Sequence, residues 1–533
     1  MPYANKSVRV LGFQQDDAKS TTAARVHELK EELQPDLPYL ISDPDQPYAA
    51  LDLGSNSFHL LVAWDRPGRL QVIDRHREVV RLASGLEQTG RLNRKSMVVA
   101  LRALERIGQR IRSLPRHNVR VVGTNALRTA GNRDEFINAA EKLLGQQVEV
   151  ISGREEARLI YLGALRSLED DADRRLVIDI GGGSTEIIFG HEHHPRIMES
   201  LRMGCISMAD RWFADGKITE KRMQRATTNA HQEIEVVEQT FRSLQCDITV
   251  GTSGTILATQ NAISETSPLS ITRDAIDKLE SLLIKRGHVD EILGLINKDR
   301  APLFPGGLAI LKALFSSLEL SSMQVSNGAL REGLLHDLLG RVHNRDIRET
   351  TVQDLIARFN VEVAHAQRVS STALYLLNQV ATDWSLENSD NSTLLRWGAV
   401  LHEVGMDVSH SSYHKHGGYL LENLDMSGFS LRDQFMLASL VRGHRRSYPS
   451  DISWENDAIH KLTILLRLAV VLRRSRTDEP LPECSLRVID SGLEMGLDRK
   501  WLKKHRLTLL DLEQESAFLE SAPYQLSIKS QNS

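Results

Sequence analysis

Two short stretches of this 533-residue chain combine acidic, hydroxyl and glycine residues in a pattern that suits phosphate chemistry. In the second stretch an apolar run ends at Asp179, Gly181–Gly183 follow, and Ser184 and Glu186 lead into another apolar run. A glycine turn lets backbone N–H groups approach an anion with no Cβ in the way. Carboxylates beside such a turn are typical ligands of a bridging divalent cation. The stretch therefore predicts a phosphate site with Mg²⁺ held by Asp179 and Glu186.

The same glycine run could be only a hairpin turn, and the motif alone leaves that role open. Two well-known glycine loops do not fit it. A P-loop needs a lysine and a hydroxyl residue after the last glycine, whereas Ser184, Thr185 and Glu186 follow Gly183. A dinucleotide loop needs a further glycine that opens a helix, whereas a β-type run follows Glu186. The expected local structure is therefore strand, turn, strand.

The first stretch, Asp52–Ser57, repeats this pattern. A strand ends at Asp52, a glycine follows two residues later, and Ser57 stands at the same distance from Asp52 as Ser184 from Asp179. Chance similarity of two hairpins is the alternative. Two copies in one chain favour a duplicated fold that holds its ligand between the copies. The expected phosphate-binding residues of the loops are Gly54, Ser55, Asn56, Ser57, Gly181, Gly182, Gly183 and Ser184.

Candidates for a base and for a further phosphate ligand lie between the two loops. Ser152 and Glu155 have the spacing of a capping box at the start of a helix. Glu156, the next residue, is either an acid favoured by the positive helix end or a general base. From spacing alone the structural role of Glu156 is preferred. Arg128 follows a strand and a polar turn, where it could bind phosphate or pair with a surface carboxylate.

Further polar turns follow apolar strands later in the chain. They include Arg202, the segment Gly251–Thr255, and Arg331 in the turn Gly328–Gly333. Loops at strand ends often converge on one ligand cleft in α/β folds. The pattern therefore predicts a doubly built α/β fold that binds a phosphorylated ligand.

Composition narrows the class of protein. The net charge is −4, with 66 basic and 70 acidic residues, so long-range attraction of a polyanion is not indicated and no nucleic acid partner is expected. Three scattered cysteines suit a reducing compartment and indicate neither a disulfide framework nor a zinc site. No apolar run approaches the roughly 18 residues of a membrane span, and the N-terminus shows no secretory signal. A cytoplasmic location is expected, with peripheral membrane association left open.

From about residue 346 helical periodicity dominates and histidines accumulate. His402-Glu403, with His365 upstream and His444 downstream, resembles the HD phosphohydrolase superfamily. That superfamily has His-Asp as its metal pair, so Glu403 departs from its pattern. A single histidine on a helix is more often a structural or surface residue.

Two basic clusters in this half, Arg442–Arg446 and Arg499–Arg506, could hold a polyanion. Ordinary solvated surface charge is the equal alternative. They are the best local candidates for a polymer track in a chain whose overall charge is close to balanced.

Several motifs together resemble the exopolyphosphatase/guanosine pentaphosphate phosphatase family, from about residue 48 to the C-terminus. The resemblance implies an α/β duplicated actin/Hsp70/sugar-kinase-like (ribonuclease H-like) fold, then a helical HD-like domain and a small C-terminal α/β domain. The motifs are Asp52–His59, Ile151–Ile160, Asp179–Glu186, Met203–Cys205 and Gly328–Gly333. The expected domains are a polar extension (1–47), two actin-like phosphatase domains (48–160 and 161–345), the HD-like domain (346–470) and the C-terminal domain (471–533).

Carried over by position, the resemblance implies that Glu156 is the catalytic glutamate, which reverses the preference from spacing. It implies that Arg128 binds phosphate and that Asp179 and Glu186 hold Mg²⁺. Asp52, the counterpart of Asp179, is added to the expected metal ligands.

The resemblance predicts an exopolyphosphatase that removes terminal phosphate from inorganic polyphosphate with Mg²⁺ and a glutamate base. Gly183 and the segment Val441–Arg446 resemble the polyphosphatase branch of the family. Removal of the 5′ γ-phosphate of guanosine pentaphosphate is the first alternative, and a non-catalytic sensor of polyphosphate or nucleotide is the second. A homodimer is expected from the resemblance alone.

Overall fold

The computed structural model describes residues 46–66, 69–86, 89–168, 172–264, 267, 270–343, 345–448, 457–489, 492–520 and 525–531. The predicted N-terminal extension, 1–47, lies outside the described residues except for its last two. Contacts divide the chain into two units. The larger unit runs to Ile347 and includes Asp425–Arg432; the smaller one comprises Arg348–Leu424 and the residues from Asp433 onward.

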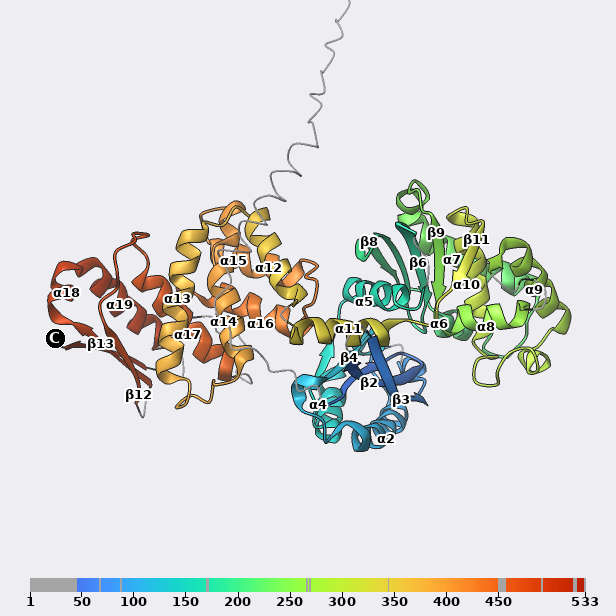
Figure 1. Ribbon diagram of the computed structural model, residues 1–533, viewed down its shortest axis with the longest axis horizontal. Helices are drawn as coiled ribbons and strands as arrows, with labels where there is room; N and C mark the ends of the chain where they lie inside the picture. The colour runs from blue at the N-terminus through green and yellow to red at the C-terminus, as the bar shows by residue number, and fades with distance from the viewer. Residues whose placement is uncertain are drawn as a thin grey trace, which may run out of the picture. The chain divides into compact units, whose positions relative to one another are not determined.

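The larger unit begins with a five-stranded sheet (Figure 1). β1 and β2 form an antiparallel hairpin that β3 extends, while β4 and β5 run parallel to β1. Along β1 successive side chains enter different cores, one under α2 and α4 and one under α5, because strand side chains alternate between faces. In spatial order the strands are β3 (Arg69–Val79), β2 (Ser57–Arg66), β1 (Tyr48–Leu53), β4 (Val119–Gly123) and β5 (Val148–Val150). The helices are α2 (Arg94–Ile111), α3 (Asn125–Thr129), α4 (Arg133–Leu144) and α5 (Gly153–Leu165).

A second sheet in the same unit repeats this plan. β6 and β7 form the antiparallel hairpin, β8 extends it, and β9 and β11 run parallel to β6. In spatial order the strands are β10 (Ile271–Thr272), β11 (Ser322–Val325), β9 (Ile248–Thr252), β6 (Arg174–Ile180), β7 (Thr185–His191) and β8 (His194–Leu201). The helices are α6 (Cys205–Trp212), α7 (Glu220–Arg242), α8 (Gly254–Ile263), α9 (Arg273–Arg286), α10 (Phe304–Ser317) and α11 (Leu330–Val342).

The two sheets share strand order and strand direction, apart from the added edge strand β10. A hairpin followed by two parallel strands is the arrangement that two matching sequence stretches predict for a duplicated domain. The expected duplicated actin-like fold is therefore confirmed. Asp52 and Asp179 occupy equivalent positions near the ends of the central strands β1 and β6.

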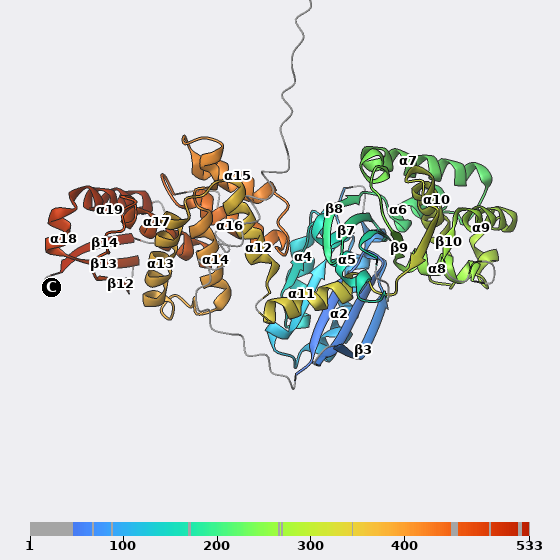
Figure 2. The same cartoon turned by 45° about the horizontal axis from the view of Figure 1, so that its top comes forward.

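The two halves meet where α5 packs against α11 (Figure 2). A Cβ at Gly163 would collide with the carbonyl oxygen of Ala329, and one at Gly333 would collide with that of Leu159. Only glycine lets the two backbones come this close. Apolar side chains of both helices, such as Ile160 and Leu334, share one buried core with residues of both sheets.

A buried network of charges ties the same two helices together. Asp337 on α11 accepts hydrogen bonds from Arg120 on β4, at 2.5 Å, and from Arg158 on α5. Arg158 also donates to both oxygens of Glu155, at 2.7 and 2.8 Å. The two arginines hold the pKa of the Asp337 carboxyl well below its usual range, despite burial. The network fixes the first turn of α5, which carries Glu156.

The smaller unit is mainly helical, with a three-stranded sheet near its end. β12 pairs antiparallel with β13, and β13 pairs parallel with β14. This arrangement fits the expected helical domain followed by a small α/β domain. The elements are α12 (Ile347–Arg358), α13 (Val363–Val380), α14 (Ser389–Leu401), α15 (Tyr413–Asn423), α16 (Leu431–Gly443), α17 (Asp457–Leu472), β12 (Cys484–Ile489), β13 (Gly492–Asp498), α18 (Arg499–Lys504), α19 (Arg506–Leu519) and β14 (Gln525–Gln531).

Among the described residues, no helix combines the length and apolar character that a membrane span requires. The prediction from the sequence, that no apolar run is long enough to span a membrane, covered the whole chain.

The α5–α11 contact predicts a stability effect. Gly333→Ala should lower the free energy of unfolding by about 1–3 kcal/mol, because the added methyl group must displace the backbone at Leu159. Thermal unfolding followed by circular dichroism measures the loss. The matched control is Gly294→Ala, where an added Cβ meets no atom within 4 Å. An unfolding midpoint for Gly333→Ala equal to that of the control would contradict the close contact.

Candidate active site

The two glycine loops approach each other in the larger unit. A Cβ at Gly183 would lie 2.5 Å from Oδ1 of Asn125 and 3.3 Å from Oγ of Ser55. A Cβ at Gly182 would lie 3.1 Å from the Ser55 Cβ. The loop of the second half is thus in van der Waals range of the loop of the first half. This is the arrangement that a ligand held between duplicated copies requires.

The start of α6 orders the second loop. The carbonyl oxygens of Gly181 and Gly182 accept hydrogen bonds from the amides of Cys205 and Ile206, each at 2.9 Å. Gly204 permits this approach, because a Cβ there would collide with Gly182. The sequence Met203-Gly-Cys205 therefore serves the loop: it turns the loop carbonyls toward α6.

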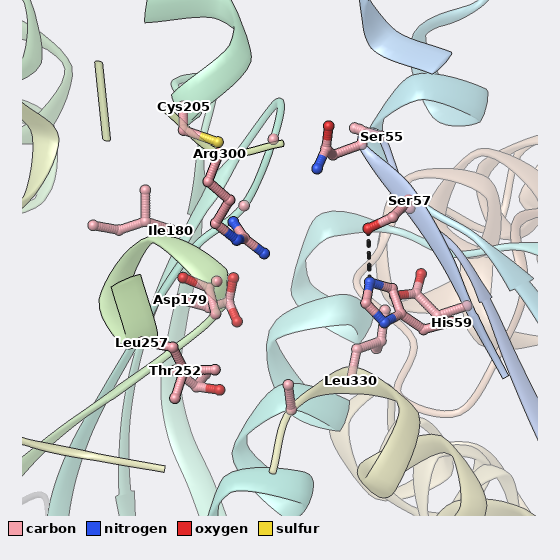
Figure 3. A pocket seen from close by; sticks show the side chains of 18 of the residues that line it. Ser55, Ser57, His59, Asp179, Ile180, Cys205, Thr252, Leu257, Arg300 and Leu330 are labelled. Atoms are coloured by element: carbon pink, nitrogen blue, oxygen red, sulfur yellow. Dashed lines mark hydrogen bonds between the residues drawn. The ribbon is translucent and has the colours of Figure 1, made fainter. Parts of the chain in front are cut away.

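Both loops line a cavity of about 450 Å³. Figure 3 shows Asp179, Arg300 and Leu257 on one side of this cleft and Ser55, Ser57 and His59 on the other. All eight predicted loop residues line the cleft, as do Asp52, Glu156 and Asp179. Glu186 and Arg128 are not among the lining residues. They contact lining residues instead, since Glu186 pairs with Asp179 in the β6–β7 register and Arg128 binds Glu156.

Strand pairing shows one difference between the two halves of the larger unit. Asp179 lies opposite Glu186 across the β6–β7 ladder, and Asp52 lies opposite His59 across the β1–β2 ladder. His59 thus stands where the second half has a carboxylate. Its ring bonds Ser57 Oγ at 2.8 Å and Arg331 at 3.1 Å. Burial, and then Arg331, lower the pKa of His59 to about 3, so the ring is neutral.

Three carboxyl groups near the cleft are buried, those of Glu156, Asp179 and Glu186, and that of Asp52 is half-buried. Burial raises the pKa of Asp179 to about 7, and burial raises the pKa values of Asp52 and Glu186 well above their usual range. The nearby Glu156 carboxylate raises all three further. Several like charges in one dry site destabilise each other unless a cation joins them.

This donor set fits a hard divalent cation. Oδ1 of Asp52 is buried and has no hydrogen-bonding partner among the described residues. One oxygen of Glu186 accepts from Ser200 Oγ at 2.8 Å, which orients that carboxylate. The cleft carboxylates do not form a set of three whose oxygens lie within 4.8 Å of one another. Such looser spacing suits Mg²⁺, which keeps several water ligands and uses one or two carboxylates.

Glu156 projects from the first turn of α5, where Ser152 caps the helix by accepting from the Glu155 amide at 3.1 Å. Arg128 donates to one Glu156 oxygen from both terminal nitrogens, each at 3.1 Å, and to the carbonyl of Ile151 at 2.8 Å. Burial raises the pKa of Glu156, and Arg128 opposes the rise. The predicted base and the predicted phosphate ligand therefore contact each other directly.

Glu155 supplies only half of the expected capping box. Its amide is capped by Ser152, but its carboxylate binds Arg158 and the amide of Gly428, the latter at 2.9 Å. In a complete capping box the Glu155 carboxylate would instead accept a hydrogen bond from the Ser152 amide. Glu155 therefore has a structural role, but as part of the buried network that holds α5 and not as a full capping box.

Three arginines of the cleft lie on elements far apart in the sequence: Arg77 on β3, Arg300 before α10, and Arg331 on α11. The turn of Arg331 was singled out in the sequence, whereas no local pattern distinguished Arg77 and Arg300. Arg300 packs directly on Gly254, where a Cβ would collide with the guanidinium. Arg202, by contrast, is exposed and does not line the cleft.

Backbone strain marks the turn between β9 and α8. Ser253 has φ 98° and ψ 166°, a region that side-chain-bearing residues rarely adopt. Such a conformation costs about 1–3 kcal/mol and is commonly found at functional sites. It places Thr252, Ser253 and Gly254 along the cleft wall.

One wall of the cleft is apolar with interspersed amides. Leu257 and Ala258 of α8 line it together with Leu295 and Ile296. The amide side chains of Asn261 and Asn297 belong to the same lining. An apolar wall with a few polar groups suits a flat organic ring better than a bare phosphate chain.

Comparisons with known proteins show the family to which the chain belongs. The sequence pattern of the Ppx/GppA phosphatase family matches residues 61–342, and that of Ppx/GppA phosphatase, domain III, matches residues 347–516. A guanosine-5′-triphosphate,3′-diphosphate pyrophosphatase of Aeromonas hydrophila is 36% identical over 88% of this chain and 96% of its own length. The chain belongs to the Ppx/GppA phosphatase family.

A second relative of the same name, from Pseudoalteromonas translucida, is 37% identical over 88% of this chain and 95% of its own length. A crystal structure of an exopolyphosphatase from Cytophaga hutchinsonii superposes with a TM-score of 0.50 at 22% identity, covering 56% of this chain and 98% of that one. At that identity the structural likeness supports the fold alone. Membership of the Ppx/GppA family makes the chain a phosphatase, as the sequence motifs predict.

The buried carboxylates predict an effect of metal on stability. Mg²⁺ should raise the thermal midpoint of the protein, because it binds the folded site and not the unfolded chain. Asp179→Asn should be more stable than the natural chain by roughly 0.5–2 kcal/mol when metal is removed, since one repelling charge is gone. It should also lose most of the increase that Mg²⁺ causes. Asp290→Asn, at an exposed acid, is the control; equal responses to Mg²⁺ in both variants would argue against the cation site.

Proposed function

We propose that this chain hydrolyses a terminal phosphoanhydride bond, and that its preferred substrate is guanosine pentaphosphate. The observation that carries the proposal is the composition of one cleft. Two opposed glycine loops and three arginines suit a phosphate chain, and an apolar wall with amide groups suits a base. Relatives at 36–37% identity bear the name of an enzyme acting on that nucleotide, which supports the same choice.

The terminal phosphoryl group would lie between Gly54–Ser57 and Gly181–Ser184. Backbone amides of glycine turns, together with hydroxyls of the two loops, bind phosphate oxygens without side chains in the way. Arg300 and Arg331 are positioned along the cleft to neutralise the charge of the following phosphates. Donors that are already in place stabilise the charge that develops in the transition state.

Glu156 is the proposed base. It lines the cleft, its burial raises its pKa, and the buried network around Glu155 holds its helix. Arg128 donates to one Glu156 oxygen. An incoming phosphate would compete for Arg128, so substrate binding would release the Glu156 carboxylate to orient a water and take its proton.

Asp179, Glu186 and Asp52 are the proposed carboxylates of the Mg²⁺ site; one or two would bind the ion directly and the rest through water. When bound, this ion would neutralise negative charge on the phosphate oxygens. Ser200, through its bond to Glu186, would keep one ligand oriented.

Inorganic polyphosphate is the second candidate substrate. The arginines and glycine loops would serve it equally well, and the sequence motifs placed it first. A polyphosphate chain has no ring to bury, so it gives no role to Leu257 and its apolar neighbours. Many phosphate-chain sites accept more than one polyanion, and the same machinery would cleave both.

Replacing the base should abolish most turnover. Glu156→Gln should reduce the rate of phosphate release by about 10²–10⁴-fold, because the amide cannot accept the water proton. Release of inorganic phosphate from guanosine pentaphosphate with Mg²⁺ measures the rate. Glu199→Gln, at a partly exposed acid that pairs with Arg154, is the control and should remain active. Turnover of folded Glu156→Gln within a few fold of the natural rate would refute the assigned role.

The apolar wall predicts which substrate is preferred. Leu257→Ser should lower kcat/KM for guanosine pentaphosphate by roughly 5–30-fold, as expected when an apolar contact with a base is lost. Polyphosphate turnover should change by less than about twofold. The control is Leu293→Ser, an exposed leucine of the neighbouring segment that is not part of the cleft lining. Equal losses on both substrates, or a natural chain that cleaves only polyphosphate, would reverse the order of the two substrates.

A further inference from the structure

The smaller unit contains a buried cluster of histidines with one glutamate. Nitrogens of His365 and His402 and an oxygen of Glu403 all lie within 4.8 Å of one another. The ring of His444 stands edge-on to that of His402, with centroids 5.2 Å apart. His365, His402 and His444 are 3%, 1% and 1% exposed, and Glu403 is 6% exposed. These four residues are named the histidine cluster.

Each histidine of the cluster has a ring nitrogen without a hydrogen-bonding partner in the part of the chain that the structure describes. These buried atoms are Nδ1 of His365, Nε2 of His402 and Nε2 of His444. A buried polar atom left without a partner costs about 1–3 kcal/mol. Three such atoms in one small region are unusual for a protein core, where nearly all buried polar groups are paired.

The partnered nitrogens show which tautomers are present. Nδ1 of His402 bonds the carbonyl of Ala399 at 2.7 Å, and Nδ1 of His444 bonds that of Val441 at 2.5 Å. A carbonyl can only accept, so Nδ1 carries the proton and Nε2 keeps its lone pair. Metal-binding histidines are commonly oriented by such a bond from the other ring nitrogen.

The rings are also electrically suited to binding a cation. Burial lowers the pKa values of His365 and His402 to about 4 and that of His444 well below its usual range. Metal ligation requires the neutral form of an imidazole, and a lowered pKa favours that form. The pattern differs from that of the cleft, whose donors are carboxylates.

We propose that His365, His402, Glu403 and His444 form a structural binding site for one divalent transition-metal ion. Imidazole-rich sites favour Zn²⁺ and its neighbours in the first transition series over Mg²⁺. Three imidazoles and one carboxylate would supply the four ligands of a closed zinc site. His444 lies outside the group of three whose donor atoms are within 4.8 Å of one another, so its ring would have to move closer to bind the ion. The ion would pair the orphaned nitrogens and cross-link α13, the end of α14 and the end of α16.

Charged side chains also lie near the histidine cluster. Arg476 donates to one oxygen of Glu403 and also to Glu362, the latter at 2.5 Å. Arg445 lies over the ring of Tyr413, which in turn is 5.4 Å from the His444 ring. Arg476 balances the charge of Glu403 and binds Oε1, the oxygen that lies 3.8 Å from Nε2 of His402, so the ion would compete with Arg476 for this carboxylate. Two cationic neighbours weaken binding of a cation, so the expected affinity is lower than that of a site without them.

Metal content of the full-length chain tests the proposal. The protein is prepared without a histidine tag, dialysed against chelator, and equilibrated with Zn²⁺ in excess Mg²⁺, which keeps the cleft carboxylates occupied. After gel filtration, mass spectrometry should find about one Zn²⁺ per chain. Co²⁺ in place of Zn²⁺ should give visible absorption typical of nitrogen ligands. Zn²⁺ should also raise the thermal midpoint by several degrees.

Four variants make the result specific. His402→Gln and His444→Gln should each lose the bound Zn²⁺, the Co²⁺ absorption and the increase in midpoint. His410→Gln, at an exposed histidine of the same unit, should keep all three. Glu186→Gln, which contacts the cleft lining in the larger unit, should also keep them. If the natural chain retains no Zn²⁺, or if folded His402→Gln retains as much as the natural chain, the proposal is wrong and water fills the cluster. If His402→Gln fails to fold, the Co²⁺ spectrum of His444→Gln decides in the same way.

Discussion

The backbones of α5 and α11 are in direct contact at Gly163 and Gly333. This contact lies between the duplicated halves, and the shared core on its two sides includes strands of both sheets. It fixes the angle at which α5 leaves the first sheet. Because Glu156 lies in the first turn of α5, the position of the proposed base depends on glycines that bind nothing themselves.

Charge strengthens the same contact. Arg120 and Arg158 share the Asp337 carboxylate inside the protein, and Arg158 holds Glu155 as well. Breaking a buried pair of this kind costs about 3–5 kcal/mol, because one charge remains without a partner. Glu155 and Glu156 are therefore neighbours with opposite tasks. The first is held by arginine in the core, and the second faces the cleft beside Arg128.

Much of the fold and site followed from local sequence. The two Asp–Gly–Ser patterns predicted the equivalent hairpins, and the apolar runs that end at Asp52 and Asp179 predicted that these residues lie near the strand ends. Gly163 and Gly333 could not be identified as partners, since their contact depends on how two helices cross. Arg77 and Arg300 were missed for the same reason: their role comes from a cleft that tertiary folding assembles. Glu156 was assigned against its spacing, by family resemblance, because helix-end acids are common for structural reasons.

The central claim is that a terminal phosphoryl group lies between the two glycine loops with Glu156 beside it. A crystal structure of the full chain with Mg²⁺ and orthovanadate, an analogue of phosphate, would test this most directly. The account predicts vanadate within hydrogen-bonding distance of amides in both Gly54–Ser57 and Gly181–Ser184, with a bound water contacting Glu156. Vanadate bound by one loop alone, or with Glu156 still held by Arg128 and away from any water near the anion, would contradict it.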